Sequence, residues 1–114
     1  MEASDKIAVV NRYIQAFAES NMDIIRDIYA TDAVVEDPVG SEPHVGMAAI
    51  EAFYEMSVPG PTTLELTGTP RCAGNAVAFP FNAVVGDDLR IEIIDVFEFN
   101  EAGKVVSMRA YWSM

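Results

Sequence analysis

Apolar side chains recur every three or four residues over the first part of the chain, which is the spacing of one helical face. The members of this face are Ile7, Val10, Tyr13, Ile14 and Phe17. With Ser4 as the N-cap, the pattern predicts a helix that ends near Asn21.

Two shorter helices are predicted further along the chain. One face of the first consists of Ile25, Ile28 and Tyr29, and residues 31–32 close this helix. The second is expected over residues 47–56, and its buried side consists of Ile50, Phe53 and Tyr54. Between these helices, residues 33–37 predict a strand that Pro38 ends, because proline holds the preceding residue extended. Residues 40–46 are expected to form a loop.

The rest of the chain alternates as strands do. Strands are predicted over residues 62–66, 76–85, 90–99 and 105–112. Turn residues at 86–88 and 100–104 join the last three strands as hairpins. Helices first and antiparallel strands last is the order of an α+β domain, and we expect residues 1–114 to form one domain.

One acidic side chain falls on an otherwise apolar strand face. This face consists of Ile91, Ile93, Asp95, Phe97 and Phe99, and its four large apolar members mark it as interior. Burial disfavours the charged form of a carboxyl group, so we expect Asp95 to be protonated at neutral pH. Two structural explanations stay open: backbone amides or a buried hydroxyl could bond Asp95, or a bulge could turn it to solvent.

Other candidate residues come from the strand ends and the tyrosines. Asp37 lies at a strand end beside a loop, where a catalytic base at a cavity mouth would belong, although Asp before Pro is also ordinary turn chemistry. Tyr13, Tyr29 and Tyr54 lie on the apolar sides of three predicted helices. Their hydroxyls need buried partners, so we expect them to cluster.

Two further residues have simpler interpretations. His44 lies in a loop with no metal-ligating neighbour, and we expect a surface residue rather than a catalyst. Trp112 shares a strand face with Met108 and Ala110, so we expect it in the core or in a pocket wall.

Composition narrows the partners. The 18 acidic and 7 basic residues give a net charge of −11, which argues against a nucleic acid or an anionic membrane as partner. Cys72 is the single cysteine, so no disulfide forms within the chain, and its surroundings lack metal-ligand spacing. The first residues lack the pattern of a signal peptide, and no apolar run approaches the ~18 residues of a membrane span. We expect a cytoplasmic protein.

Five short motifs together resemble the Δ5-3-ketosteroid isomerases, which have the nuclear transport factor 2-like (cystatin-like) fold. They are Arg12-Tyr13-Ile14, Val35-Glu36-Asp37-Pro38, Ala52-Phe53-Tyr54, Ile94-Asp95-Val96 and Ala110-Tyr111-Trp112. They follow the family's order and approximate spacing from about Tyr13 to Trp112. The resemblance implies a cone in which three N-terminal helices pack in a strongly curved mixed β-sheet.

The resemblance also implies roles. Asp37 would be the proton-shuttling base, and Tyr13 and Asp95 the oxyanion-hole donors, with Tyr54 and Tyr29 behind Tyr13 in a hydrogen-bonded chain. Ketosteroid isomerases are themselves the known case of a carboxylic acid kept neutral to donate a hydrogen bond. The implied steroid-binding residues are Val39, Phe53, Phe79, Phe81, Met108, Ala110 and Trp112.

The implied reaction converts 3-oxo-Δ5-steroids to 3-oxo-Δ4-steroids by moving a proton from carbon 4 to carbon 6. It needs no cofactor or metal, and the family suggests a homodimer packed through the sheet. Two features depart from the resemblance. The chain stops two residues after Trp112, which we expect to alter the dimer edge, and Val39 stands where an aromatic is expected, which would alter the steroid fit.

Three other functions fit the same fold. An epoxide hydrolase resembling limonene-epoxide hydrolase would need an arginine between two acids, whereas Arg90 and Arg109 alternate outward. A site resembling scytalone dehydratase or a polyketide cyclase would need an inward histidine, and His44 is a poor candidate. A non-catalytic carrier of a hydrophobic ligand would need the pocket but not the base.

Overall fold

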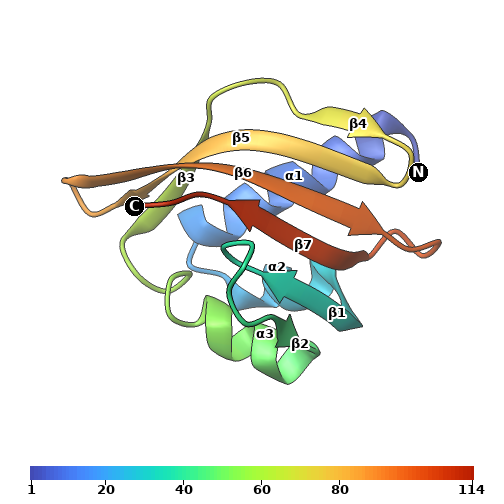
Figure 1. The fold of residues 1–114 in the computed structure, drawn as a ribbon, viewed down its shortest axis with the longest axis horizontal. Helices are drawn as coiled ribbons and strands as arrows, with labels where there is room; N and C mark the ends of the chain where they lie inside the picture. The colour runs from blue at the N-terminus through green and yellow to red at the C-terminus, as the bar shows by residue number, and fades with distance from the viewer.

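A mixed sheet curls around three helices in the computed structural model, which describes residues 1–114 (Figure 1). The helices are α1 (Ala3–Ala18), α2 (Met22–Ile28) and α3 (Met47–Tyr54). The strands are β1 (Tyr29–Glu36), β2 (His44–Val45), β3 (Thr62–Leu66), β4 (Arg71–Ala73), β5 (Ala76–Val85), β6 (Leu89–Phe99) and β7 (Val105–Tyr111). The α+β prediction is therefore confirmed.

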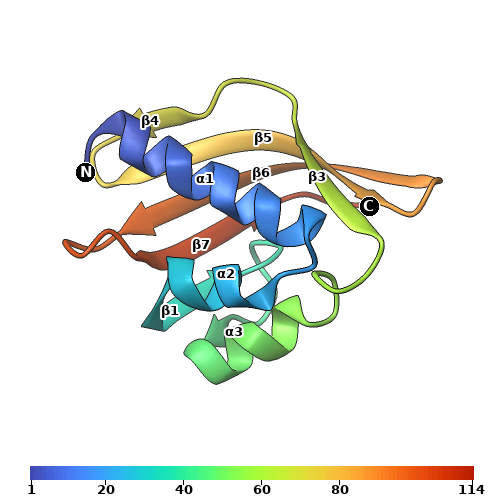
Figure 2. The ribbon, with the colours of Figure 1, turned by 180° about the vertical axis from the view of Figure 1, so that it is seen from behind.

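The sheet runs in the order β2-β1-β7-β6-β5-β3, and β4 pairs with β5 beyond the end of β3. Only β1 and β7 pair in parallel, which makes the sheet mixed, as the resemblance implied. Figure 2 shows α1 lying across the concave face of the sheet, with α2 and α3 below it on the side of β1. The core lies between this concave face and the helices.

Side-chain alternation explains which face is buried. Val77, Phe79, Phe81 and Ala83 of β5 are buried and their neighbours are not, as the sequence predicted. On α1, the face with Val10, Tyr13 and Phe17 is buried against the sheet, while Ile7 and Ile14 are partly exposed. Both patterns place aromatic rings in one shared interior.

The ends of the predicted helices need correction. The N-cap of α1 is Glu2 rather than Ser4, and its backbone N–H donates to Asp5 Oδ2 over 2.8 Å in a capping box. The helix ends at Ala18 rather than near Asn21. The third helix, α3, ends at Tyr54 and not at residue 56.

The placement of Tyr29 on a helix was wrong. The second helix ends at Ile28, and Tyr29 is already extended and begins β1, where it pairs with Val105 of β7. Pairing with a strand so distant in sequence supplies backbone hydrogen bonds that no local pattern reveals. β1 therefore begins before the predicted residue 33.

Two short strands were not predicted. His44 and Val45 form β2 inside the expected loop and pair with β1, and Arg71–Ala73 form β4 and pair with β5. Each is too short to show a periodic pattern, so its pairing partner decides its conformation. None of the three helices is long and apolar enough to cross a membrane.

Candidate active site

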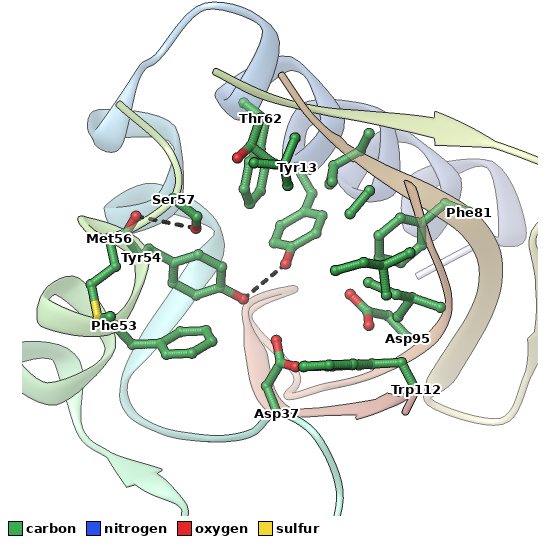
Figure 3. Close-up of a pocket in the computed structure, with 16 residues that line it drawn as sticks. Tyr13, Asp37, Phe53, Tyr54, Met56, Ser57, Thr62, Phe81, Asp95 and Trp112 are labelled. Carbon is green, nitrogen blue, oxygen red and sulfur yellow. Dashed lines mark hydrogen bonds between the residues drawn. The ribbon is translucent and has the colours of Figure 1, made fainter. Parts of the chain in front are cut away.

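A cavity of about 230 Å³ opens between the helices and the concave face of the sheet (Figure 3). Most of the side chains around it are apolar. The lining residues are Tyr13, Phe17, Asp37, Phe53, Tyr54, Met56, Ser57, Thr62, Leu64, Phe81, Ala83, Val85, Ile91, Ile93, Asp95 and Trp112. Two of them, Asp37 and Asp95, are carboxylic acids. Carboxylic acids are rarely found in such a buried, mostly apolar setting.

Asp95 lies on the inward face of β6, opposite Phe79 of β5 and Ala110 of β7. Its side chain is only 1% exposed, and no group of the chain forms a hydrogen bond with either carboxyl oxygen. The two structural explanations for Asp95 are therefore wrong in this structure: no amide or hydroxyl satisfies it, and no bulge turns it to solvent. A buried carboxyl left without a protein partner is available to a ligand in the cavity.

The surroundings of Asp95 favour its neutral form. Burial raises the pKa of Asp95 well above that of an ordinary aspartic acid, and the nearby charge of Asp37 raises it further. A protonated Asp95 carries an O–H donor that faces the cavity.

Asp37 follows the end of β1 and faces the same cavity (Figure 3). Burial raises its pKa, while two groups oppose that effect: a hydrogen bond from Trp112 and the positive charge of His44. Trp112 Nε1 donates to Asp37 Oδ1 over 2.6 Å. The loop after Asp37 is tied to β7, because the N–H of Val39 donates to the carbonyl of Ala110 over 2.8 Å. Asp37 is thus fixed in place with one oxygen bonded and the carboxylate facing the cavity.

The bond between Trp112 and Asp37 was not predicted. Trp112 was predicted in the core or a pocket wall, and it lies in the cavity wall. The available signal was the indole N–H itself, since a tryptophan pointing inward needs an acceptor for this group.

The three tyrosine hydroxyls form the expected cluster. Tyr54 Oη lies 3.0 Å from Tyr13 Oη and 2.5 Å from Tyr29 Oη, so the Tyr54 hydroxyl links the other two. Burial is the largest cause that raises the pKa of each hydroxyl well above the ordinary value, so all three keep their protons. Only Tyr13 and Tyr54 line the cavity, and Tyr29 lies behind them.

The predicted steroid-binding residues divide into two groups. Phe53, Phe81 and Trp112 line the cavity. The other four do not: Phe79, Met108 and Ala110 are buried in the core, and Val39 borders a surface recess with Pro38 outside the cavity. Alternation correctly finds an inward side chain, but it does not distinguish a cavity wall from the packed core beside it.

Several lining residues were missed. Ile91 and Ile93 share the inward face with Asp95, and Ala83 shares one with Phe81, so alternation contained a signal for these three. Ser57 and Met56 belong to the turn after α3, and no local pattern placed them at a cavity.

The remaining candidates are placed as follows. His44 is half-buried in β2 rather than fully exposed, and its ring lies against Phe53. Arg90 and Arg109 are about half exposed and pair with Glu65 and Glu36, and neither lines the cavity. Cys72 is free, and no three His, Cys, Asp or Glu side chains come together as a metal site requires.

The chemistry available in the cavity follows from these groups. Asp37 offers a carboxylate that can take and return a proton, and Tyr13 and neutral Asp95 offer two hydrogen-bond donors. Donors held in a largely apolar cavity stabilise a developing oxyanion better than water does.

Comparison with known proteins identifies relatives over almost the whole chain. The model of the SnoaL-like domain family matches residues 10–108. A steroid Delta-isomerase of Nocardioides simplex is 40% identical over 99% of this chain and 93% of its own length. An epoxide hydrolase, LasB of Streptomyces lasalocidi, is 29% identical over 93% of this chain, which corresponds to 40% of that protein.

A solved structure gives a similar result. The epoxide hydrolase/cyclase-like enzyme SalBIII, described in connection with pyran ring formation in the polyether salinomycin, superposes with a TM-score of 0.90. It is 28% identical, and the match covers 99% of this chain and 94% of that one. These relatives are enzymes whose names indicate different reactions, so the geometry of the site has to decide between them.

Proposed function

This chain belongs to the SnoaL-like family of nuclear transport factor 2-like domains, and on that premise we propose that it is a cofactor-independent steroid Δ-isomerase. The observation that carries the proposal is the pair of unbonded oxygens of buried Asp95, in one cavity with Asp37 and Tyr13. The similarity to a steroid Delta-isomerase supports the substrate class.

In the proposed reaction, Asp37 is the base. Its carboxylate removes a proton from carbon 4 of a 3-oxo-Δ5-steroid, and the electron pair of that C–H bond moves toward the 3-oxygen to give a dienolate. The same carboxyl group then returns the proton to carbon 6, which leaves the conjugated 3-oxo-Δ4-steroid. The bond from Trp112 holds one oxygen of Asp37 and leaves the other free for the proton.

Tyr13 and Asp95 are proposed to stabilise the dienolate oxygen. Each would donate one O–H, and one such donor is worth on the order of 10² to 10³ in rate. While Tyr13 donates to the substrate, its oxygen accepts from Tyr54, whose oxygen accepts from Tyr29. This direction of donation strengthens the Tyr13 donor, because hydrogen bonds in a chain polarise one another.

Epoxide opening is the second candidate, and the close superposition with SalBIII favours it. Two acids in a cavity could also activate water against an epoxide. No arginine lines this cavity, however, and Asp95 has no cationic partner that would keep it charged. These observations support isomerisation over epoxide hydrolysis.

The direct test uses 5-androstene-3,17-dione. If the proposal holds, purified protein produces the conjugated enone, which is measured as a rise in ultraviolet absorbance above the buffer rate. Binding of the steroid without any rise would favour the hydrophobic-ligand carrier. Turnover of an epoxide but not of the steroid would favour the epoxide hydrolase.

Asp37→Asn tests the base separately from binding. An amide cannot take the proton, so we expect turnover to fall by about 10² to 10⁴ or more. Affinity for a phenolic steroid that resembles the dienolate should be retained, because Tyr13 and Asp95 remain. Turnover equal to the wild type would remove Asp37 from the mechanism.

We also expect the enzyme to act as a homodimer in the cytoplasm. The single unpaired Cys72 fits a reducing compartment. The exposed apolar pair Ile94 and Tyr111, on adjacent central strands, supports packing through the outer face of the sheet.

A further inference from the structure

His44 lies near the proposed base, at the end of β1. It pairs with Val35 across the antiparallel ladder of β1 and β2. Asp37 is two residues beyond Val35, directly after the last residue of β1. Residues at this offset from a paired position are close enough to interact electrostatically, and the charge of His44 does act on the Asp37 carboxyl group.

Contact with a cavity residue holds the imidazole in place. The ring centroids of His44 and Phe53 are 4.4 Å apart and their planes differ by 30°, so the two rings are in tilted contact. Phe53 belongs to α3 and lines the cavity with Asp37 (Figure 3). His44 is therefore half-buried between a strand and a helix, on the outer side of the cavity wall.

The other titratable groups around Asp37 are acids or phenols. Asp95 approaches from β6 and Tyr13 from α1, while the hydroxyls of Tyr29 and Tyr54 lie behind Tyr13. None of them supplies a positive charge.

The nearby basic side chain on β7 is already engaged. Arg109 forms an ion pair with Glu36 over 3.4 Å, and Glu36 precedes Asp37 and so alternates to the opposite side. On the side of His44, the exposed Glu42 is a further charged neighbour in the loop. The charge of His44 is the cationic influence that lowers the pKa of Asp37 against the effect of burial.

We propose that His44 is a positioning residue for catalysis, whose imidazolium keeps Asp37 ionised as the solution becomes acidic and whose ring supports Phe53 against the cavity. The proposal rests on the proposed function only in that Asp37 is the base of the reaction. A positive charge on His44 opposes protonation of Asp37, because a nearby cation stabilises the ionised carboxylate. The acidic limit of activity then lies at lower pH than burial alone would set.

The chain contains its own reporter for this proposal. Trp112 is the single tryptophan, and its indole N–H donates to Asp37. Protonation of Asp37 weakens that bond, so the indole N–H resonance should shift with pH in the absence of any substrate. Asp37→Asn is the control, because the part of the pH dependence that belongs to Asp37 should disappear in this variant.

Three substitutions separate charge from packing. His44→Phe keeps a ring against Phe53 and removes the charge, and His44→Gln removes both. His44→Arg keeps a positive charge at every pH. We expect the midpoint of the Trp112 titration to rise by about half a pH unit in the first two variants, and to stay at or below the wild-type value in His44→Arg.

Activity provides the second measurement. If Asp37 is the base, the acidic limb of kcat/KM for the steroid should move to higher pH in His44→Phe and His44→Gln by the same amount as the Trp112 midpoint. A uniform loss of rate with an unmoved limb would indicate only a structural role and would overturn the proposal. Urea unfolding of each variant verifies that the fold is retained.

Failure of the two proposals would be distinguishable. A Trp112 midpoint that does not change in His44→Phe or His44→Gln overturns the role of His44, whatever the activity. A shifted midpoint without steroid turnover in any variant leaves the coupling between His44 and Asp37 in place and contradicts the proposed isomerase function.

Discussion

At the scale of single residues, two aspartic acids with the same chemistry are given different properties by their surroundings. Asp95 is enclosed by apolar side chains and has no hydrogen-bond partner, so its neutral form is favoured. Asp37 is only half-buried, and Trp112 and the charge of His44 favour its ionised form. An acid and a base can therefore coexist in one small cavity.

The first prediction concerns the donor role of Asp95. Asp95→Ala should lower kcat for the steroid on the order of 10²-fold, because the oxyanion loses a donor. The free energy of unfolding should stay within about 1 kcal/mol of the wild type or rise, since an unpaired buried polar group is removed. Asp95→Asn keeps an N–H donor and should retain more of the rate. Large unfolding with unchanged kcat would make Asp95 structural.

The second prediction concerns pH and stability. The pKa of Asp95 is raised in the folded state, so the folded protein binds this proton more tightly than the unfolded chain, whose aspartic acids titrate near ~3.9. The contribution of Asp95 to the free energy of unfolding therefore decreases as the pH rises above about 4, until the pH passes its folded pKa.

Urea unfolding of the wild type and Asp95→Asn at a series of pH values measures this effect. The stability of Asp95→Asn relative to the wild type should increase with pH, because the amide does not ionise. Parallel curves for the two proteins would show that Asp95 titrates alike in both states.

At the scale of elements, the hydroxyl of Tyr54 joins three segments that are distant in sequence. Tyr54 is the last residue of α3, Tyr13 lies in α1, and Tyr29 begins β1. The ring of Tyr54 also contacts both partners: edge to face with Tyr13, at 5.9 Å between centroids, and tilted with Tyr29, at 5.7 Å. The cluster therefore positions the Tyr13 donor by connecting the helices with the first strand.

The third prediction tests this central position. Tyr54→Phe leaves the buried hydroxyls of Tyr13 and Tyr29 without their shared partner, and we expect a loss of about 1 to 3 kcal/mol in the free energy of unfolding. Tyr29→Phe is the matched control, because it removes only the last hydroxyl of the hydrogen-bonded series and leaves the bond between Tyr13 and Tyr54. Urea unfolding and kcat should both be affected more in Tyr54→Phe, and equal effects would contradict a central role.

At the scale of the whole molecule, the sheet has two unlike faces. The helices pack on the concave face and enclose the cavity there. The outer face carries Ile94, which is 48% exposed, and its pairing partner on β7, Tyr111, which is 44% exposed. The pairing partner of Ile94 on β5 is Pro80. Three central strands thus present an apolar row that a second copy could cover by two-fold symmetry.

The fourth prediction is that this row mediates dimerisation. Ile94→Glu should weaken the dimer at least about tenfold in sedimentation equilibrium, because two like charges would be buried near the two-fold axis. Leu89→Glu is the control, since Leu89 is also exposed but alternates to the concave face. With a net charge of −11 on each copy, association should strengthen as salt rises from low to physiological concentration. A monomer under all these conditions would contradict the homodimer.

Local patterns predicted much of this architecture because they report burial. The alternation that placed Asp95 inside and Phe79 and Phe81 on one face of β5 follows from the geometry of a strand, and both assignments agree with the structure. The same alternation could not separate Phe81 in the cavity wall from Phe79 in the core. That difference depends on whether a second element fills the space in front of a side chain.

Periodicity and composition were enough to predict the α+β class, the inward position of Asp95, the clustering of the tyrosines and the acidic charge, because they act locally or as sums over the chain. They could not predict that Tyr29 begins a strand, that Trp112 bonds Asp37 or that His44 lies near that carboxyl group. Each of these depends on pairing between segments far apart in sequence, such as β1 with β7 and β1 with β2. Contacts of that kind are set by how the whole chain packs.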